Sequence, residues 1–129
     1  MPNGLLIGKT VYKLLSENQD IKNKVGNKIF PLIANLETTF PFIVYSRNSV
    51  VPEYTKGGIV EDIINLEIIC VSTSYIESIE IANLVRRTLE MVRYKDDDMI
   101  INQCRLLDVA ENYQDDAYTQ TLIFEIRIS

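Results

Sequence analysis

The sequence of 129 residues contains no histidine and no tryptophan, and it has only two cysteines. The lack of histidine removes the commonest general base of enzymes and the commonest metal ligand. Cys70 and Cys104 are too few for a disulfide framework in a chain of this length, so we expect both to be buried free thiols. The composition therefore argues against histidine-based chemistry and against a disulfide-stabilised fold.

Long apolar runs and clusters of positive charge are missing as well. No run approaches the ~20 residues that a transmembrane helix needs, and the opening MPNGLLIGK lacks the pattern of a secretion signal. The net charge is −5 and the pI is about 4.7. No block of lysine or arginine is present that would hold a phosphate backbone. We therefore expect neither a membrane partner nor stable sequence-specific binding of nucleic acid.

The most regular stretch of the sequence predicts a strand followed directly by a long helix. In residues 63–72, apolar residues alternate with polar ones, as in a half-buried strand. Ser74 precedes Glu77 by three residues, which is the spacing of a capping box. In that motif the serine oxygen accepts a hydrogen bond from an orphan amide, and the glutamate accepts one from the cap residue's own amide. We expect the helix to span about residues 75–93.

A broad apolar arc surrounds this predicted helix. At about 100° per residue, one face holds Ile79, Ala82, Val85, Leu89 and Val92. Ile81, Leu84 and Met91 widen that face to more than half of the circumference, more than a helix normally buries against one sheet. The helix must therefore contact a second surface, which is either the first helix of the same chain or a neighbouring subunit. In the second case, these three residues are candidate interface residues.

The remaining patterns predict further helices and strands on both sides of this stretch. We expect a first helix over residues 4–18, a turn with a short helical piece that ends at Gly26, and strands at 28–32, 40–47, 100–110 and 118–129. Together they predict a single α+β domain, residues 1–129. Its sheet is mostly antiparallel with about 4–5 strands, and two main helices pack on one face in a two-layer arrangement. The other face would carry polar residues, exposed to solvent or to another subunit: Asn65, Glu67, Thr121, Glu125 and Arg127.

Residues 48–60 form the longest segment without a periodic pattern. A proline and the pair Gly57-Gly58 predict a loop, or a hairpin with a long mobile tip. Tyr54 lies in this segment, where a core role is least available, and tyrosine is favoured at protein interfaces. We regard Tyr54, Lys56, Gly57 and Gly58 as candidate contacts to a partner, with a Tyr54 that folds back on its own domain as an equal alternative.

No group of residues in the sequence makes a convincing catalytic, cofactor or metal site. The acidic segment KDDDM, residues 95–99, lacks the glycine and the further oxygen ligands of a cation-binding loop, so we expect a solvated turn. Gly57-Gly58 lacks the following lysine of a phosphate-binding loop. Ser72 and Ser74 lie at a strand end and a helix cap, where structural roles account for them. We expect no enzyme activity, no cofactor and no metal.

Two segments carry a recognisable order of features. The segment GNKIFPLIANLETTFPFIVYSR has a glycine, a short strand with a proline, and an apolar-Pro-aromatic step into a Val-Tyr strand, at Gly26, Ile29, Pro31, Pro41, Phe42, Val44 and Tyr45. The segment NLEIICVSTSYIESIEIANLVRRTLE has a strand and then a Ser/Thr-X-Tyr entry into a helix. Within that helix, Ala, Leu and Val-Arg follow one another at a spacing like that of a known family. With a closing strand at residues 121–128, this order resembles the phage tail-completion family. Those are the small tail-terminator or tail-to-head joining proteins of long-tailed phages and prophages. Cys70 departs from the pattern, because the family often has a bulky aromatic there.

The resemblance implies a structural, non-enzymatic protein that forms a ring, commonly a hexamer, at the end of the tail tube. There it would stop tube growth and join the tail to the head. The implied partners are copies of itself, the tail-tube protein and the head-connector protein. The implied location is the virion tail, after assembly in the bacterial host cytoplasm. The alternative hypothesis is a non-catalytic α+β binding module for a small ligand or peptide.

Overall fold

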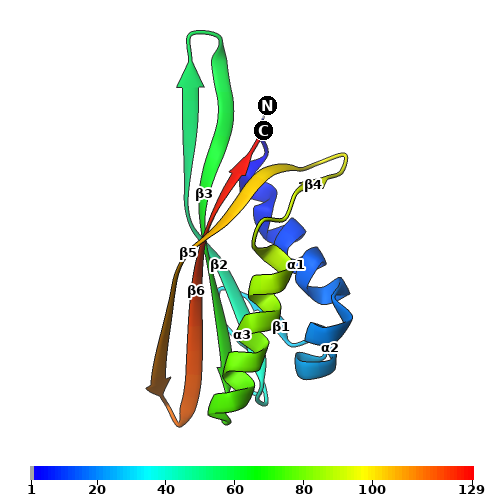
Figure 1. Ribbon diagram of the computed structural model, residues 1–129, viewed down its shortest axis with the longest axis vertical. Coiled ribbons are helices and arrows are strands. Elements are labelled where there is room, and N and C mark those ends of the chain that lie inside the picture. Colours follow the sequence, from blue (N-terminus) through cyan, green and yellow to red (C-terminus); the bar gives the residue numbers. More distant parts are fainter. Residues whose placement is uncertain (1) are drawn as a thin grey trace.

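The computed structural model describes residues 2–129 and shows one twisted sheet with its helices on one face (Figure 1). In chain order, the elements are the 3₁₀ helix η1 (Gly4–Leu6), α1 (Ile7–Glu17), α2 (Gln19–Val25), β1 (Ile29–Pro31), β2 (Phe42–Thr55), β3 (Gly58–Ser72), α3 (Tyr75–Leu89), β4 (Tyr94–Lys95), β5 (Ile100–Gln114) and β6 (Ala117–Ile128). The α+β class and the two-layer arrangement agree with the sequence-based expectation.

The sheet has six strands in the order β1-β2-β3-β6-β5-β4, which corrects the expected number of about 4–5. β1 and β2 pair in parallel, whereas all other neighbours pair antiparallel. The parallel pair arises because residues 32–41 carry the chain back to the same end of the sheet before β2 begins. β4 has two residues, too few to produce a periodic pattern in the sequence.

Three α-helices cover one face of the sheet, where two main helices were expected. α1 and α2 are separated at Asn18, whose side chain accepts a hydrogen bond from the amide of Ile21 at 3.1 Å. Gly26 ends α2 with a φ of 64°, as the sequence predicts. α3 ends at Leu89, before the expected end near residue 93, because the chain turns at Met91 and its amide donates to the carbonyl of Cys104 at 2.8 Å. A tertiary contact therefore ends a helix that the apolar pattern alone would continue.

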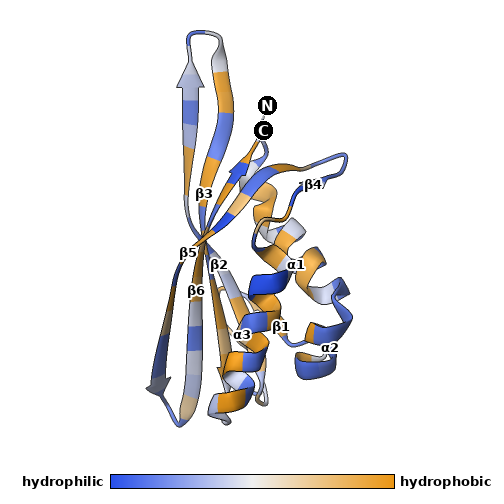
Figure 2. Ribbon diagram, viewed as in Figure 1, coloured by the Kyte–Doolittle hydropathy of each residue, from blue (hydrophilic) through white to orange (hydrophobic). Residues whose placement is uncertain are grey.

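The hydrophobic core lies between the helices and the inner face of the sheet. Figure 2 shows apolar and polar residues alternating along the central strands. The largest fully buried side chains come from α1, α2, α3 and the three strands β2, β3 and β6: Ile7, Leu15, Ile21, Ile43, Ile64, Leu66, Ile68, Ile81, Leu89, Leu122, Phe124 and Ile126. Alternate residues of β3 and β6 supply half of this list, as expected for strands with one face against helices.

The start of α3 follows the predicted capping box only in part. The Ser74 hydroxyl oxygen accepts a hydrogen bond from the amide of Glu77 at 3.3 Å, as expected. The Glu77 carboxylate, however, accepts from the Ser72 hydroxyl at 2.8 Å, and the amide of Ser74 donates to the Ser72 oxygen at 3.0 Å. Ser72 thus relays the second half of the motif: the strand end holds its hydroxyl between the Glu77 carboxylate and the Ser74 amide, and the hydroxyl bonds to both.

No helix in residues 2–129 is long and apolar enough to cross a membrane.

Candidate functional site

β2 and β3 continue past the rest of the sheet as a two-stranded hairpin (Figure 1). β6 pairs with β3 only from Asp62 onward, and β1 pairs with β2 only at residues 43–45. Beyond these points the two strands pair only with each other, and Lys56 and Gly57 form the turn between them. We call residues 51–61 the arm. Of the two predicted alternatives for this region, a loop or a hairpin, the structure shows the hairpin.

The arm exposes apolar side chains to solvent. Val51, Tyr54 and Val60 are 55%, 66% and 50% exposed. Gly58 has a φ of 123°, a conformation that favours glycine and allows β3 to begin directly after the turn. The four candidate residues of this region, Tyr54, Lys56, Gly57 and Gly58, therefore lie together at the tip of the arm.

The base of the arm is tied to β6 through Arg127, on the sheet face away from the helices. Its guanidinium lies 2.6 Å from a Glu61 carboxylate oxygen, 3.3 Å from Glu125 and 3.8 Å from Glu53. The hydrogen bond to Glu61, together with the charges of Glu125 and Glu61, raises the pKa of Arg127. Glu53 and Glu61 belong to the arm, so this cluster fixes the position at which the arm leaves the body of the protein.

The N-terminal turn η1 holds the arm base from the helix side. The Gly4 amide donates to a carboxylate oxygen of Asp62 at 2.9 Å in a buried position, and the Arg47 guanidinium donates to the carbonyl of Leu5 at 2.9 Å. A Cβ added to Gly4 would collide with the Asp62 carboxylate and with Val50, so the contact needs glycine. No pattern in the sequence pointed to this contact, because it joins residues 58 positions apart.

The three candidate residues of the helical arc differ in how far they are exposed to solvent. Ile81 is completely buried within the protomer, where it packs in the core. Leu84 is half-buried against the core, and Met91 is 72% exposed beyond the end of α3. The arc is wide because α3 contacts β3 and β6 on one side and α1 and α2 on the other. The second surface that the arc required is therefore largely supplied within the chain.

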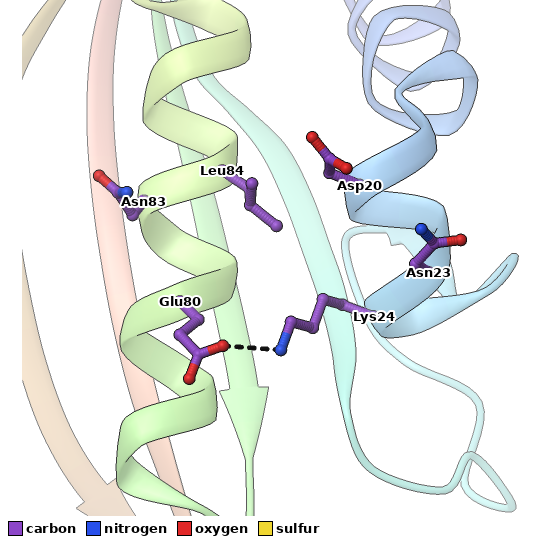
Figure 3. Close-up of a pocket in the computed structure, with 6 residues that line it drawn as sticks. All are labelled: Asp20, Asn23, Lys24, Glu80, Asn83 and Leu84. Carbon is purple, nitrogen blue, oxygen red and sulfur yellow. Dashed lines mark hydrogen bonds and ion pairs between the residues drawn. The ribbon is translucent and has the colours of Figure 1, made fainter.

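A surface hollow between α2 and α3 includes Leu84 in its lining (Figure 3). Its lining comes from both helices: Asp20, Asn23, Lys24, Glu80, Asn83 and Leu84. Lys24 and Glu80 face each other as an ion pair at 2.7 Å, and this hydrogen bond raises the pKa of Lys24. The two charges therefore pair with each other across the hollow.

The sheet face away from the helices has a polar half and an apolar half. The polar half, next to the arm, holds Asn65, Glu67, Glu125 and Arg127, all half-buried, as the alternation predicted. The other half is apolar because Phe42 pairs with Val71, and Val44 pairs with Ile69, across β2 and β3. Sequence reasoning missed the apolar half, because only the pairing of β2 with β3 brings these four residues together.

The described residues offer no group of reactive side chains. Both cysteines are buried and free, as predicted. Burial raises the pKa of the Cys70 thiol, and burial with the nearby Glu90 charge raises the pKa of Cys104 to about 12. Within residues 2–129, no group of three or more cysteine, aspartate or glutamate side chains is arranged to hold a metal ion. The predicted aspartate turn at 95–99 is closed by Asp96, which accepts from the amides of Asp98 and Met99.

Comparisons with known proteins bear on the fold and on the family of this chain. The fold is similar to a chain in the structure titled "Virion of native gene transfer agent (GTA) particle", with a TM-score of 0.81 and 14% sequence identity. The match covers 92% of this chain and 90% of that chain, and at such low identity it establishes the fold alone. Among curated proteins, none is significantly similar in sequence. The profile of the family described as "Tail completion protein gp17" matches residues 9–129. The chain therefore belongs to the tail completion protein gp17 family and is a structural component of a phage-type tail.

Proposed function

We propose that this protein forms a ring at the end of the tail tube, where it stops tube growth and joins the tail to the head. The arm is the observation that carries the proposal. It exposes Val51, Tyr54 and Val60 while making no use of them in its own core. Exposed apolar groups gathered on a projecting element mark an interaction surface. Asymmetric contacts between identical subunits close into a ring when their rotation closes.

The partners that follow from this role are further copies of the chain, the tail-tube protein and the head-connector protein. The site residues that we assign to these contacts are Tyr54, Lys56, Gly57 and Gly58 at the arm tip, with Met91 as an exposed apolar residue elsewhere. Leu84 has only part of its surface available. A binding module for a small ligand has weaker support, since the hollow in Figure 3 is lined mainly by charged and amide side chains of the surface.

Light scattering tests the proposal. We expect the purified chain to assemble into a discrete oligomer, alone at high concentration or on addition of the tail-tube protein. Negative-stain electron microscopy of the same sample should show rings, and capped tubes where tube protein is present. A chain that stays monomeric at every concentration, with and without tube protein, would refute the ring.

A further inference from the structure

We infer that the arm tip of one copy docks into the groove at the apolar half of the uncovered sheet face of the next copy. The inference rests on the proposed ring and names the contact that closes it. The groove is a hollow of about 410 Å³. It is bounded by Phe40 and Phe42 on one side and by the β5–β6 hairpin with Asp115 on the other, and Ile69 and Val71 of β3 lie between them.

One wall of the groove is aromatic. The rings of Phe40 and Phe42 are stacked with centroids 5.5 Å apart, and Phe42 also contacts Phe30 edge-on at 6.4 Å. Phe40 and Phe42 remain partly exposed, although their neighbour Val71 is buried. Tyr54 is the exposed aromatic residue near the arm tip. Aromatic side chains bury much area at low conformational cost and pack favourably against other rings, so Tyr54 suits this wall.

The charges at the two ends are complementary. Lys56, in the arm turn, is the cation of residues 51–61 and is exposed. The far end of the groove is the β5–β6 turn, which consists of Asp115 and Asp116, both exposed and both with positive φ. If Tyr54 packs against the phenylalanine wall, Lys56, two residues later, lies toward the two carboxylates of the β5–β6 turn. Opposite charges at the rim of an interface select the partner and its orientation.

The positions of the arm and the groove require a head-to-tail contact. The arm tip and the β5–β6 turn lie at opposite ends of the long axis of the molecule (Figure 1). A chain cannot fold its own arm into its own groove without disrupting the pairing of β2 with β3, since that pairing continues through the arm to Thr55 and Gly58. The contact therefore joins different copies, and a head-to-tail contact is the kind that generates a closed ring.

Cysteine cross-linking tests the docking directly. The double variant Lys56→Cys/Asp116→Cys, treated with a short bis-maleimide at neutral pH, should give a ladder of covalent oligomers on denaturing gels. A mixture of the two single variants should give dimers and nothing larger. The native thiols are buried and stay unreactive. The matched control is Asp97→Cys/Asp116→Cys, which places the first thiol in an exposed turn outside the arm and should give no ladder.

Charge exchange supplies a second readout. We expect Lys56→Asp to weaken self-association about fivefold, the upper range for an exposed ion pair. The combination with Asp115→Lys and Asp116→Lys should restore it, whereas Lys95→Asp should leave it unchanged. Rings that form normally but give neither a ladder nor a charge-exchange effect would overturn the docking and leave the proposed ring intact. A wild-type chain that never forms rings overturns both.

Discussion

The arm and the body of this protein contain the same two strands in two different environments. Within the body, β2 and β3 place alternate residues in the core, where Ile43 and Ile64 are fully buried. In the arm the same strands have no helix on one side and no third strand beside them, so Val51, Tyr54 and Val60 are exposed. The difference shows that hairpin pairing alone continues the strands, while side-chain burial depends on the neighbouring layers. Burial stabilises the body, and the exposed arm is the surface that we propose for contact.

Phe124→Ala should strongly lower the free energy of unfolding of the body. Phe124 is the largest completely buried side chain, at the centre of β6, and removing such a ring costs about 3–5 kcal/mol through lost transfer energy and the cavity that remains. Urea denaturation followed by circular dichroism measures the change in the free energy of unfolding. Ile123→Ala is the control, because Ile123 is adjacent in β6 but faces away from the helices and is only half-buried. Equal losses for the two variants would contradict the assigned faces of the sheet.

Asp62→Ala should weaken the junction between the two regions. The substitution leaves the buried Gly4 amide without its acceptor, which costs about 1–3 kcal/mol. Hydrogen exchange should become faster at residues 4–6, which η1 comprises. Asp62→Asn retains a side-chain oxygen and should lose less stability than the alanine variant. If Asp62→Ala unfolds at the same urea concentration as the wild type, the contact does not hold the arm base.

Ser74→Ala should have a smaller effect, confined to the body. Loss of an N-cap acceptor costs about 1 kcal/mol, and the Glu77 amide would lose the bond that it makes at 3.3 Å. Ser74→Thr keeps the hydroxyl and serves as the control. The measurement is again the midpoint of urea denaturation. A loss above about 2 kcal/mol would mean that the Ser72 relay depends on this hydroxyl as well.

Tyr54→Asp should have the smallest effect on folding and yet abolish assembly. Exposed positions outside special contacts usually change stability by about 0.5 kcal/mol or less, and Tyr54 is more exposed than Val51 and Val60, the other exposed large hydrophobic residues of the arm. A charge there would oppose burial against an apolar partner. Denaturation should match the wild type, while light scattering with tube protein and an assay for completed tails should show failure. Normal completion of tails by this variant would show that the arm is not the contact surface.

Much of the body could be predicted from the sequence, because local patterns report burial. The alternation in residues 63–72 and in 121–128 predicted two central strands, and the spacing of Ser74 and Glu77 predicted the start of α3. The ends of elements were predicted less well. α3 stops at Leu89 because the chain turns at Met91, and β4 exists because the strand β5 offers it an edge.

The candidate surfaces were harder to predict, because their composition depends on which strands pair with each other more than on local sequence patterns. The sequence indicated the arm tip through Tyr54 and the glycine pair, since turn residues and an isolated aromatic are local signals. The burial of Ile81 within the protomer could not be predicted, because a helical projection does not show which side of a wide apolar arc the rest of the chain covers. The phenylalanine groove was not predicted at all, since Phe42 and Val71 become neighbours only when β2 pairs with β3.

The sequence by itself determined the class of the fold, the helical and central strand positions, the buried thiols and the family, because each depends on residues close together along the chain or on their order. Tertiary structure decided the six-strand order, the contact of Gly4 with Asp62 and the division of the open sheet face into polar and apolar halves. These features join residues that are distant in the chain. Their positions follow from the simultaneous packing of three helices and six strands, which no local pattern contains.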